Sequence, residues 1–226
     1  QQRLLLETCY ESLHGALQRR TSLMGSRVSV HVGVEHLDWQ LLNLQRTTKT
    51  ALQRVSAYAA SGEQGHVASG RLSFVFDLHG PAMSINTACS SGLAAAHLSA
   101  GALQASDCEL GLAASSKLIL LAFSVAESVL AADGRSKSFD AKGDGYGRSE
   151  TTGSLVLAAG IGTTASLVGS AVHSGGRGAS LTAPNGTGHV KTISHAVAGA
   201  SLTPDEVRNI QAQGLGSALA DPIEVN

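Results

Sequence analysis

The stretch GPAMSINTACSSG, residues 80–92, decides the fold of this chain. A short apolar run leads into small residues, and a segment rich in Ala and Leu then continues to about Ala105. An apolar run, a cluster of small residues and a long helix-forming segment predict a strand, a tight turn and a helix, in that order. The pattern places the thiol of Cys89 at the corner between strand and helix.

A thiol at such a corner has the physical setting of a nucleophile. The free N–H groups and the positive dipole end of a helix stabilise a thiolate relative to a thiol. The small neighbours between Ala88 and Gly92 would let a bulky acyl group approach. The competing interpretation is a structural one, because an isolated cysteine is often a small buried hydrophobic residue.

Patterns along the rest of the chain predict a layered α/β fold. Apolar residues recur at helical spacing from residue 1 to about 20, and the valines from Val28 to Val34 alternate with other residues as in a strand. Thr203 and Glu206 form a capping box around Pro204, which predicts the start of a helix. Further strands are predicted over residues 108–114, 155–159, 167–173 and about 208–213, an irregular or partly helical segment over 35–62, and a loop over 131–146. Alternation of strands and helices without repeats favours one layered sheet.

Composition excludes several classes of function. The chain has 226 residues, of which 43% are hydrophobic, so it can bury a real core, and its length suggests one domain or a large part of one. The formal net charge of −1 gives no electrostatic signature of nucleic-acid or anionic-membrane binding. The most apolar stretch, residues 118–130, contains Glu127 and is too short for a membrane span.

The three cysteines are Cys9, Cys89 and Cys108, and they lack the paired spacing of a zinc site or a disulfide framework. We therefore expect no metal and a reducing intracellular compartment, either the cytoplasm or a plastid-like organelle.

The sequence around Cys89 resembles the active-site segment of ketosynthase (β-ketoacyl synthase) domains of polyketide and fatty acid synthases. The resemblance rests on TACSS at 87–91, followed by Ala-rich sequence and His97. Three further motifs resemble family signatures in the family's order: QQRLLLE at 1–7, DGRSKSFD with GDGYGR within 133–148, and LTAPNG at 181–186. The resemblance thus covers essentially the whole chain.

This resemblance implies a thiolase-like fold of alternating α/β/α/β/α layers. It also implies that the chain, 1–226, is a partial ketosynthase domain: the N-terminal half over about 1–175 and the start of the C-terminal half over about 176–226. The opening at Gln1 resembles a helix already under way, without a cap before it, as expected for a central piece of a longer protein. Ketosynthases are usually homodimers, which implies a homodimer for the complete domain.

The resemblance further implies an acyltransferase chemistry centred on Cys89. In the family this cysteine takes an acyl chain from the phosphopantetheine arm of an acyl carrier protein. Two histidines then promote decarboxylation of a malonyl group on a carrier protein, and the resulting enolate condenses with the acyl chain. The thioester supplies the activation, so the family binds no cofactor or metal for this step.

One position departs from the family's catalytic pattern. The first histidine normally lies in a segment of the form EAHGTGT followed by GDPIE, and the matching stretches here are QAQGLGS at 211–217 and ADPIE at 220–224. Gln213 thus stands where the resemblance implies a histidine. An amide can donate a hydrogen bond but cannot act as an acid or base near neutral pH. We expect impaired condensation, while acyl loading on Cys89 survives.

The second histidine and a nearby lysine lie, in the family, beyond the point where this chain stops. The segment GHVKTISHAVAG at 188–199 is superficially similar to the distal histidine motif, but it precedes Gln213, against the family order. We therefore interpret it as a connecting amphipathic helix and read His189 and His195 as structural. The same structural or surface reading applies to His97 and to His14, His31, His36, His66, His79 and His173.

Two interpretations therefore compete for the function. The first is a ketosynthase-type acyltransferase. The second is a non-elongating ketosynthase-like module that binds or relays acyl chains or acts structurally, because Gln213 replaces the first histidine and the distal one is absent from the chain. A sequence error at Gln213 is a third reading, since His and Gln codons differ by a single base. Asn86, where many relatives have Asp, is expected to keep the same cap-like hydrogen bonding.

Overall fold

The computed structural model describes residues 1–35, 38–39, 42, 58, 61–62, 64–121, 129–160, 165–180 and 183–225. The chain divides into two compact units, residues 1–124 with 149–163 and residues 125–148 with 164–226. Most of the predicted irregular segment 35–62 and part of the apolar stretch 118–130, as well as His36, lie outside the described residues.

The first unit is built on a four-stranded sheet with the order β2-β1-β3-β4. Its strands are β1 (Val28–Val34), β2 (Ala82–Ile85), β3 (Leu110–Lys117) and β4 (Thr151–Ala158). Strand β1 pairs in parallel with both β2 and β3, whereas β3 and β4 are antiparallel. Parallel strands that are adjacent in space but far apart in sequence are typical of α/β sheets.

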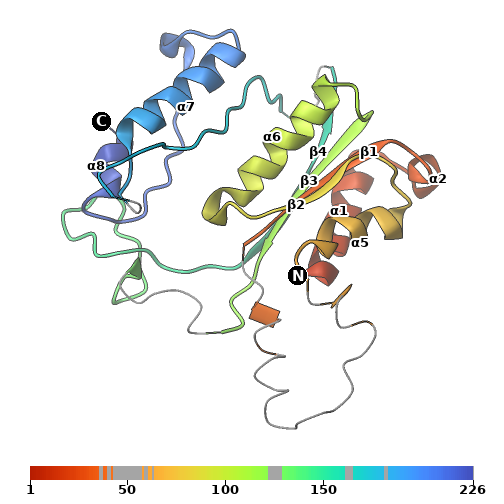
Figure 1. Ribbon diagram of the computed structural model, residues 1–226, viewed down its shortest axis with the longest axis horizontal. Helices are drawn as coiled ribbons and strands as arrows, with labels where there is room; N and C mark the ends of the chain where they lie inside the picture. The colour runs from red at the N-terminus through yellow and green to blue at the C-terminus, as the bar shows by residue number, and fades with distance from the viewer. Residues whose placement is uncertain are drawn as a thin grey trace. The chain divides into compact units, whose positions relative to one another are not determined.

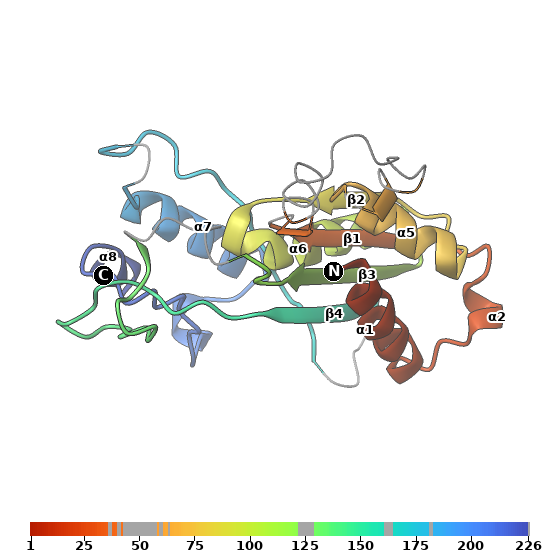
Figure 2. The same ribbon diagram turned by 90° about the horizontal axis from the view of Figure 1, so that it is seen from below.

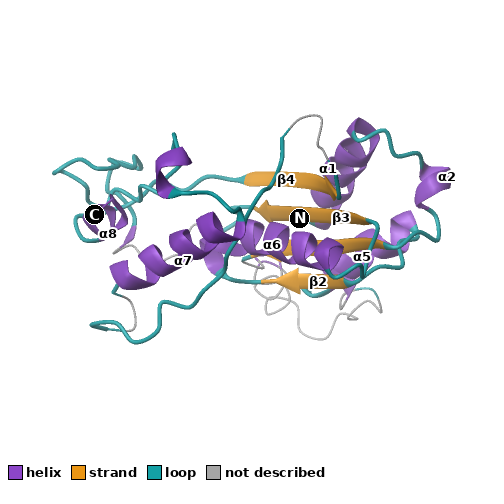
Figure 3. Ribbon diagram, turned by 90° about the horizontal axis from the view of Figure 1, so that it is seen from above, coloured by secondary structure: helices purple, strands orange, loops and turns teal. Residues whose placement is uncertain are grey.

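Helices cover both faces of this sheet (Figures 1, 2 and 3). Helix α6 (Ser91–Gln104) packs on one face against β1 and β3. On the other face, α1 (Gln2–Gly15) packs on β4 and β3, and α5 (Val67–Phe76) packs on β2 and β1. A short helix, α2 (Arg20–Leu23), follows α1. This three-layer arrangement confirms the predicted α/β class.

The core of the unit lies between α1, α5 and the sheet. It consists of the apolar side chains Leu5, Cys9, Leu13, Leu23, Val28, Val30, Val32, Val34, Ala68, Leu72, Leu78, Leu112 and Ala114. The buried residues of α1 recur every four positions, which is why a helix with polar residues elsewhere on its surface forms here. Helix α1 ends at Gly15, earlier than predicted, and Leu17 beyond it has a left-handed φ of 58°.

Strand β1 is the predicted strand of alternating valines, and it is buried along its whole length. All seven residues are buried because α6 covers the face that carries Ser29 and His31. The Nδ1 atom of His31 lies 2.8 Å from the Oγ of Ser99 on α6, and burial lowers the pKa of His31. His31 is therefore a buried structural residue.

The second unit contains mostly loops and short helices. Its helices are α7 (Gly186–Gly199), the 3-10 turn η3 (Pro204–Glu206) and α8 (Ala220–Val225). Asn185 caps α7, since its Oδ1 accepts a hydrogen bond from the Gly188 N–H at 3.3 Å. The capping box of Thr203 and Glu206 is confirmed, but it opens a single 3-10 turn and not a longer helix.

Two predicted strands, 167–173 and 208–213, are wrong. Residues 165–173 and 207–216 contain no strand in the structure. An apolar run becomes a strand only where a neighbouring strand pairs with its backbone N–H and C=O groups. The described part of the chain offers these two runs no such neighbour. None of the helices described is both long and apolar enough to span a lipid bilayer.

Candidate active site

Cys89 lies in the turn between strand β2 and helix α6. Strand β2 ends at Ile85, a 3-10 turn η1 covers Ala88–Ser90, and α6 begins at Ser91. The thiol therefore sits in a tight turn directly before the helix. Among the three cysteines, Cys89 is exposed, while Cys9 and Cys108 are buried, and burial raises the pKa of Cys9 to about 12. Cys89 is thus the accessible thiol.

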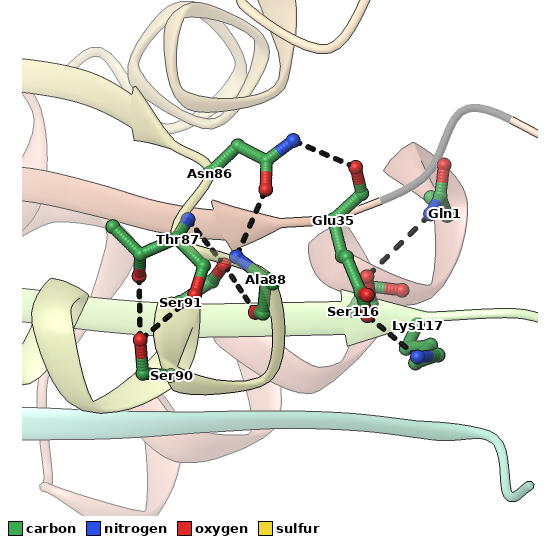
Figure 4. A network of polar contacts seen from close by, with 9 residues as sticks. All are labelled: Gln1, Glu35, Asn86, Thr87, Ala88, Ser90, Ser91, Ser116 and Lys117. Atoms are coloured by element: carbon green, nitrogen blue, oxygen red, sulfur yellow. Dashed lines mark hydrogen bonds and ion pairs between the residues drawn. The ribbon is translucent and has the colours of Figure 1, made fainter. Parts of the chain in front are cut away.

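The turn is held in an unusual backbone conformation beside the thiol. Ala88 has a left-handed φ of 53°, which costs a residue with a Cβ about 1 kcal/mol. Hydrogen bonds from both sides hold this conformation (Figure 4). The Ala88 N–H donates to Asn86 Oδ1 at 3.1 Å, and Ser91 Oγ donates to the Ala88 carbonyl at 2.7 Å. The Ser91 Oγ also accepts the Thr87 N–H at 2.9 Å.

Serine hydroxyls supply the remaining contacts of the turn. Ser90 Oγ donates to the carbonyl of Thr87 at 2.8 Å and lies 3.0 Å from its Oγ1. The small residues after Cys89 thus do more than leave space, because their hydroxyls bind two backbone carbonyls and one backbone N–H of the turn. The cap-like hydrogen bond expected of Asn86 is present, since its Oδ1 accepts the Ala88 N–H, although the N-cap residues of η1 and α6 are Thr87 and Ser90.

A close approach of β1 fixes the position of this turn on the sheet. A Cβ placed on Gly33 of β1 would lie 2.6 Å from the carbonyl carbon of Ser91, at the first residue of α6. A Cβ on Gly92 would reach 3.1 Å from the Oγ of Ser115 on β3. Only a glycine at position 33 permits the backbone of α6 to approach β1 so closely.

The ends of β1 and β3 meet the turn through a polar network (Figure 4). The Asn86 Nδ2 donates to the backbone carbonyl of Glu35 at 2.9 Å. The Glu35 carboxylate in turn forms an ion pair with Lys117, with Nζ and Oε2 2.5 Å apart. The Gln1 side chain donates to the Ser116 carbonyl at 3.5 Å. The ion pair between Glu35 and Lys117 was not predicted from the sequence.

Gln213 lies in the second unit, in a loop that precedes α8. The residue is exposed, and its backbone N–H donates to the Oε1 of Glu224 at 2.6 Å. The next N–H, of Gly214, donates to Oε2 of the same carboxylate at 2.9 Å. Glu224 therefore holds the loop at the predicted site residue by two backbone contacts.

A second carboxylate anchors the same loop from within α8. The buried Asp221 accepts the N–H groups of Gly216, Ser217 and Phe139 at distances between 2.7 and 3.2 Å. Hydrogen bonding, first from the Phe139 N–H, lowers the pKa of Asp221. Gly214 and Gly216 adopt left-handed φ angles of 56° and 77°. In the sequence, the acidic residues that follow Gly214 and Gly216 are the feature from which this anchoring of the loop could have been predicted.

Other histidines lie on or beside helices α6 and α7. His97 lies half-buried on α6, and His195 on α7 lies 3.0 Å from His173, both rings being exposed. In the ranges that the structure describes, no three His, Cys, Asp or Glu side chains form a group that could hold a metal ion. Cys89 belongs to the first unit and Gln213 to the second.

Comparison with known protein families identifies both parts of the chain. Residues 1–160 match the model of the β-ketoacyl synthase N-terminal domain, and residues 164–226 match that of the C-terminal domain. The predicted division of the domain near residue 175 stays a prediction.

The sequence is similar to bacterial polyketide synthases. It is 40% identical to polyketide synthase GfsB of Streptomyces halstedii over 99% of this chain, and 38% identical to erythronolide synthase EryA3 of Saccharopolyspora erythraea over 100% of it. The chain spans 4% and 7% of the lengths of these two proteins. They are thus far larger than the region they share with this chain.

Solved structures show the same similarity. An oxazolomycin ketosynthase domain from Streptomyces albus superimposes with a TM-score of 0.87 at 29% identity, covering 100% of this chain and 41% of that one. A ketosynthase from module 6 of the bacillaene synthase of Bacillus subtilis, at 23% identity, has the same fold, with a TM-score of 0.83 over 99% of this chain and 38% of that one. The predicted thiolase-like fold is confirmed.

Proposed function

Because the chain belongs to the β-ketoacyl synthase family as a ketosynthase domain, we propose that Cys89 takes an acyl chain from a carrier-protein thioester. The observation that carries this proposal is the exposed thiol at the corner between β2 and α6. The partner is an acyl carrier protein, whose phosphopantetheine arm brings the acyl group. The relatives named above make polyketide synthesis the pathway class that we propose.

The acyl transfer is a balanced exchange of one thioester for another. The Cys89 Sγ, as thiolate, attacks the carbonyl carbon of the acyl thioester and forms a tetrahedral oxyanion. The C–S bond to phosphopantetheine then breaks, and the released thiolate takes up the proton that Cys89 gave up. The Cys89 backbone N–H, in the turn before α6, is our candidate for the oxyanion donor. Loss of such a donor typically costs about 10²–10³ in rate.

Decarboxylative condensation is the second half of the family reaction. Malonyl-carrier loses CO₂, and the resulting enolate carbon attacks the acyl group on Cys89, with return of the free thiolate. This step needs a group that stabilises the enolate oxygen. Gln213 offers an amide N–H for this purpose but no titrating group. We propose that condensation is therefore the weaker of the two activities.

A non-elongating acyl-binding module is the alternative that Gln213 favours. In this case acyl transfer to Cys89 would proceed, and decarboxylation of malonyl-carrier would not. The exposed Cys89 speaks against a purely structural module, because a scaffold has no need of a thiol in a strained turn. The two alternatives differ in one measurable step.

The complete domain is proposed to act as a homodimer. Strand β2 lies at an edge of the sheet among the described residues, and Met83 on it is 45% exposed. Unpaired edge strands with exposed apolar side chains favour pairing with another chain. Analytical ultracentrifugation of the protein would test this, and a monomer at micromolar concentration would contradict it.

The acyl transfer itself can be tested by intact-protein mass spectrometry. We expect a mass increase of one acyl group after incubation with an acyl-carrier thioester, and release of one equivalent of carrier thiol. The variant Cys89→Ala should show no increase. The variant Cys108→Ala removes a buried thiol and serves as the matched control, with loading retained. Loading that persists in Cys89→Ala would overturn the proposal.

A further inference from the structure

The ion pair between Glu35 and Lys117 lies at the carboxyl ends of two adjacent parallel strands. Val34 of β1 stands opposite Ser116 of β3 in the sheet, so the two charged residues follow at the next position. Their side chains are only 14% and 24% exposed. Ion pairs shielded from solvent in this way interact more strongly than surface pairs and cost more when one partner is lost.

The Asn86 side chain connects this ion pair to the nucleophile's turn. Asn86 donates from Nδ2 to the Glu35 carbonyl at 2.9 Å and accepts the Ala88 N–H on Oδ1 at 3.1 Å. Ala88 directly precedes Cys89 and has the left-handed φ of 53°. The chain of contacts therefore runs from Lys117 through Glu35 and Asn86 to the backbone beside the thiol (Figure 4).

In this chain the Asn86 amide makes both links at once. An amide has both a donor and an acceptor, whereas an ionised Asp has acceptors alone. An Asp at position 86 could hold the Ala88 N–H but would turn an oxygen toward the Glu35 carbonyl. The backbone at Glu35 can hold Asn86 only if the end of β1 stays in place, and the ion pair ties that end to β3.

We infer that Glu35 and Lys117 are positioning residues for Cys89. The ion pair fixes the carboxyl end of β1, the Glu35 carbonyl orients Asn86, and Asn86 holds the Ala88 N–H in the strained turn. The direction of the Cys89 N–H and thiol then depends on a charge pair that touches neither substrate nor thiol. The role in acyl transfer rests on the proposed function, but the effect on the thiol does not.

Two single variants break the ion pair, and a double variant restores it with the positions of the two charges exchanged. Lys117→Met and Glu35→Gln each remove one charge, whereas the double variant Glu35→Lys/Lys117→Glu restores an ion pair. The variant Glu109→Gln is a matched control, because Arg27 and Glu109 form an exposed pair, 3.6 Å apart, just before the start of the same two strands. Asn86→Asp tests the link itself.

Three quantities should be measured on each variant of the protein: the thermal midpoint, the rate of Cys89 alkylation by iodoacetamide, and the rate of acyl transfer from an acyl-pantetheine thioester. We expect Lys117→Met, Glu35→Gln and Asn86→Asp to slow acyl transfer about tenfold, since small displacements of reacting groups carry penalties of that size or larger. Alkylation should change in the same variants. The double variant should recover both rates to within about threefold, and Glu109→Gln should match the unmodified protein.

The outcomes separate this inference from the proposed function. If the folded variants lose thermal stability but keep both rates, the pair is only structural and the inference is overturned. The same conclusion follows if the double variant recovers stability without recovering the rates. If the unmodified protein accepts no acyl group but alkylation responds as expected, the proposed function fails and the positioning role stands.

Discussion

Gly33 on β1 and Ser91 at the start of α6 are in backbone contact, so close that a Cβ on Gly33 would lie 2.6 Å from the Ser91 carbonyl carbon. This contact sets how deeply the Cys89 turn lies on the sheet. We predict that Gly33→Ala lowers the free energy of unfolding by about 1–3 kcal/mol, the usual cost of overpacking. Urea unfolding followed by circular dichroism would measure the change.

The control for this prediction lies on α6 itself. A Cβ on Gly101 would meet no atom within 4 Å. Gly101→Ala should therefore raise the free energy of unfolding by about 0.5–1 kcal/mol, because Ala favours a helix interior. Equal effects of the two substitutions would show that the contact with Ser91 does not limit the packing.

The left-handed φ of Ala88, beside Cys89, predicts how substitutions at this position change the free energy of unfolding. Ala88 has a φ of 53°, which glycine adopts without a steric penalty. Ala88→Gly should raise the free energy of unfolding by up to about 1 kcal/mol, and Ala88→Val should lower it, since a β-branched residue tolerates this region least. Chemical denaturation of the three proteins would check the order. A glycine variant no more stable than the unmodified protein would argue against strain at this position.

The buried His31 predicts a dependence of stability on pH. Burial places its pKa in the folded state below the ordinary value of 6.5, so the unfolded chain binds the proton first as the pH falls. The contribution of His31 is complete above about pH 6.5 and is lost progressively below it, by at most about 1.4 kcal/mol per pH unit. Thermal unfolding between pH 7.5 and 5 should show a shallower dependence in His31→Gln. An unchanged dependence would mean that His31 titrates alike in both states.

Restoring a histidine at position 213 tests the assignment of that site. In the full-length protein, Gln213→His should increase malonyl decarboxylation, and a positioned proton donor is typically worth about 10²–10⁴ in rate. Release of CO₂ from malonyl-carrier would be followed directly. Gln211→His, two residues earlier in the same exposed loop, should leave the rate unchanged. If Gln213→His also has no effect, Gln213 does not occupy the catalytic position.

Local sequence was sufficient for the elements that local chemistry decides. The strand, turn and helix around Cys89 follow from apolar, small and helix-forming residues in succession, and the structure has them in that order. The cap-like hydrogen bond of Asn86 and the capping box at Thr203 were likewise predictable, because each contact spans three residues or fewer.

Contacts between distant residues were not predictable in the same way. Glu35 and Lys117 are 82 residues apart in sequence, and no local pattern pairs them. The anchoring of the Gln213 loop depends on carboxylates of α8, whose direction is set by the fold of the second unit. The alternation of β1 predicted a strand, but whether its non-valine face meets solvent or a helix is decided by the packing of α6.

The strand order also determines when the first unit can fold during synthesis. Helix α1 precedes β4 by more than a hundred residues in the chain, yet its buried face packs mainly on β4, which ends at Ala158. At about 5–20 residues per second, a nascent chain keeps this apolar face without its partner for on the order of ten seconds. The central strand β1 likewise lacks its pairing partner β3 until β3 has been synthesised. We therefore expect the sheet of the first unit to close only after β4 has been synthesised.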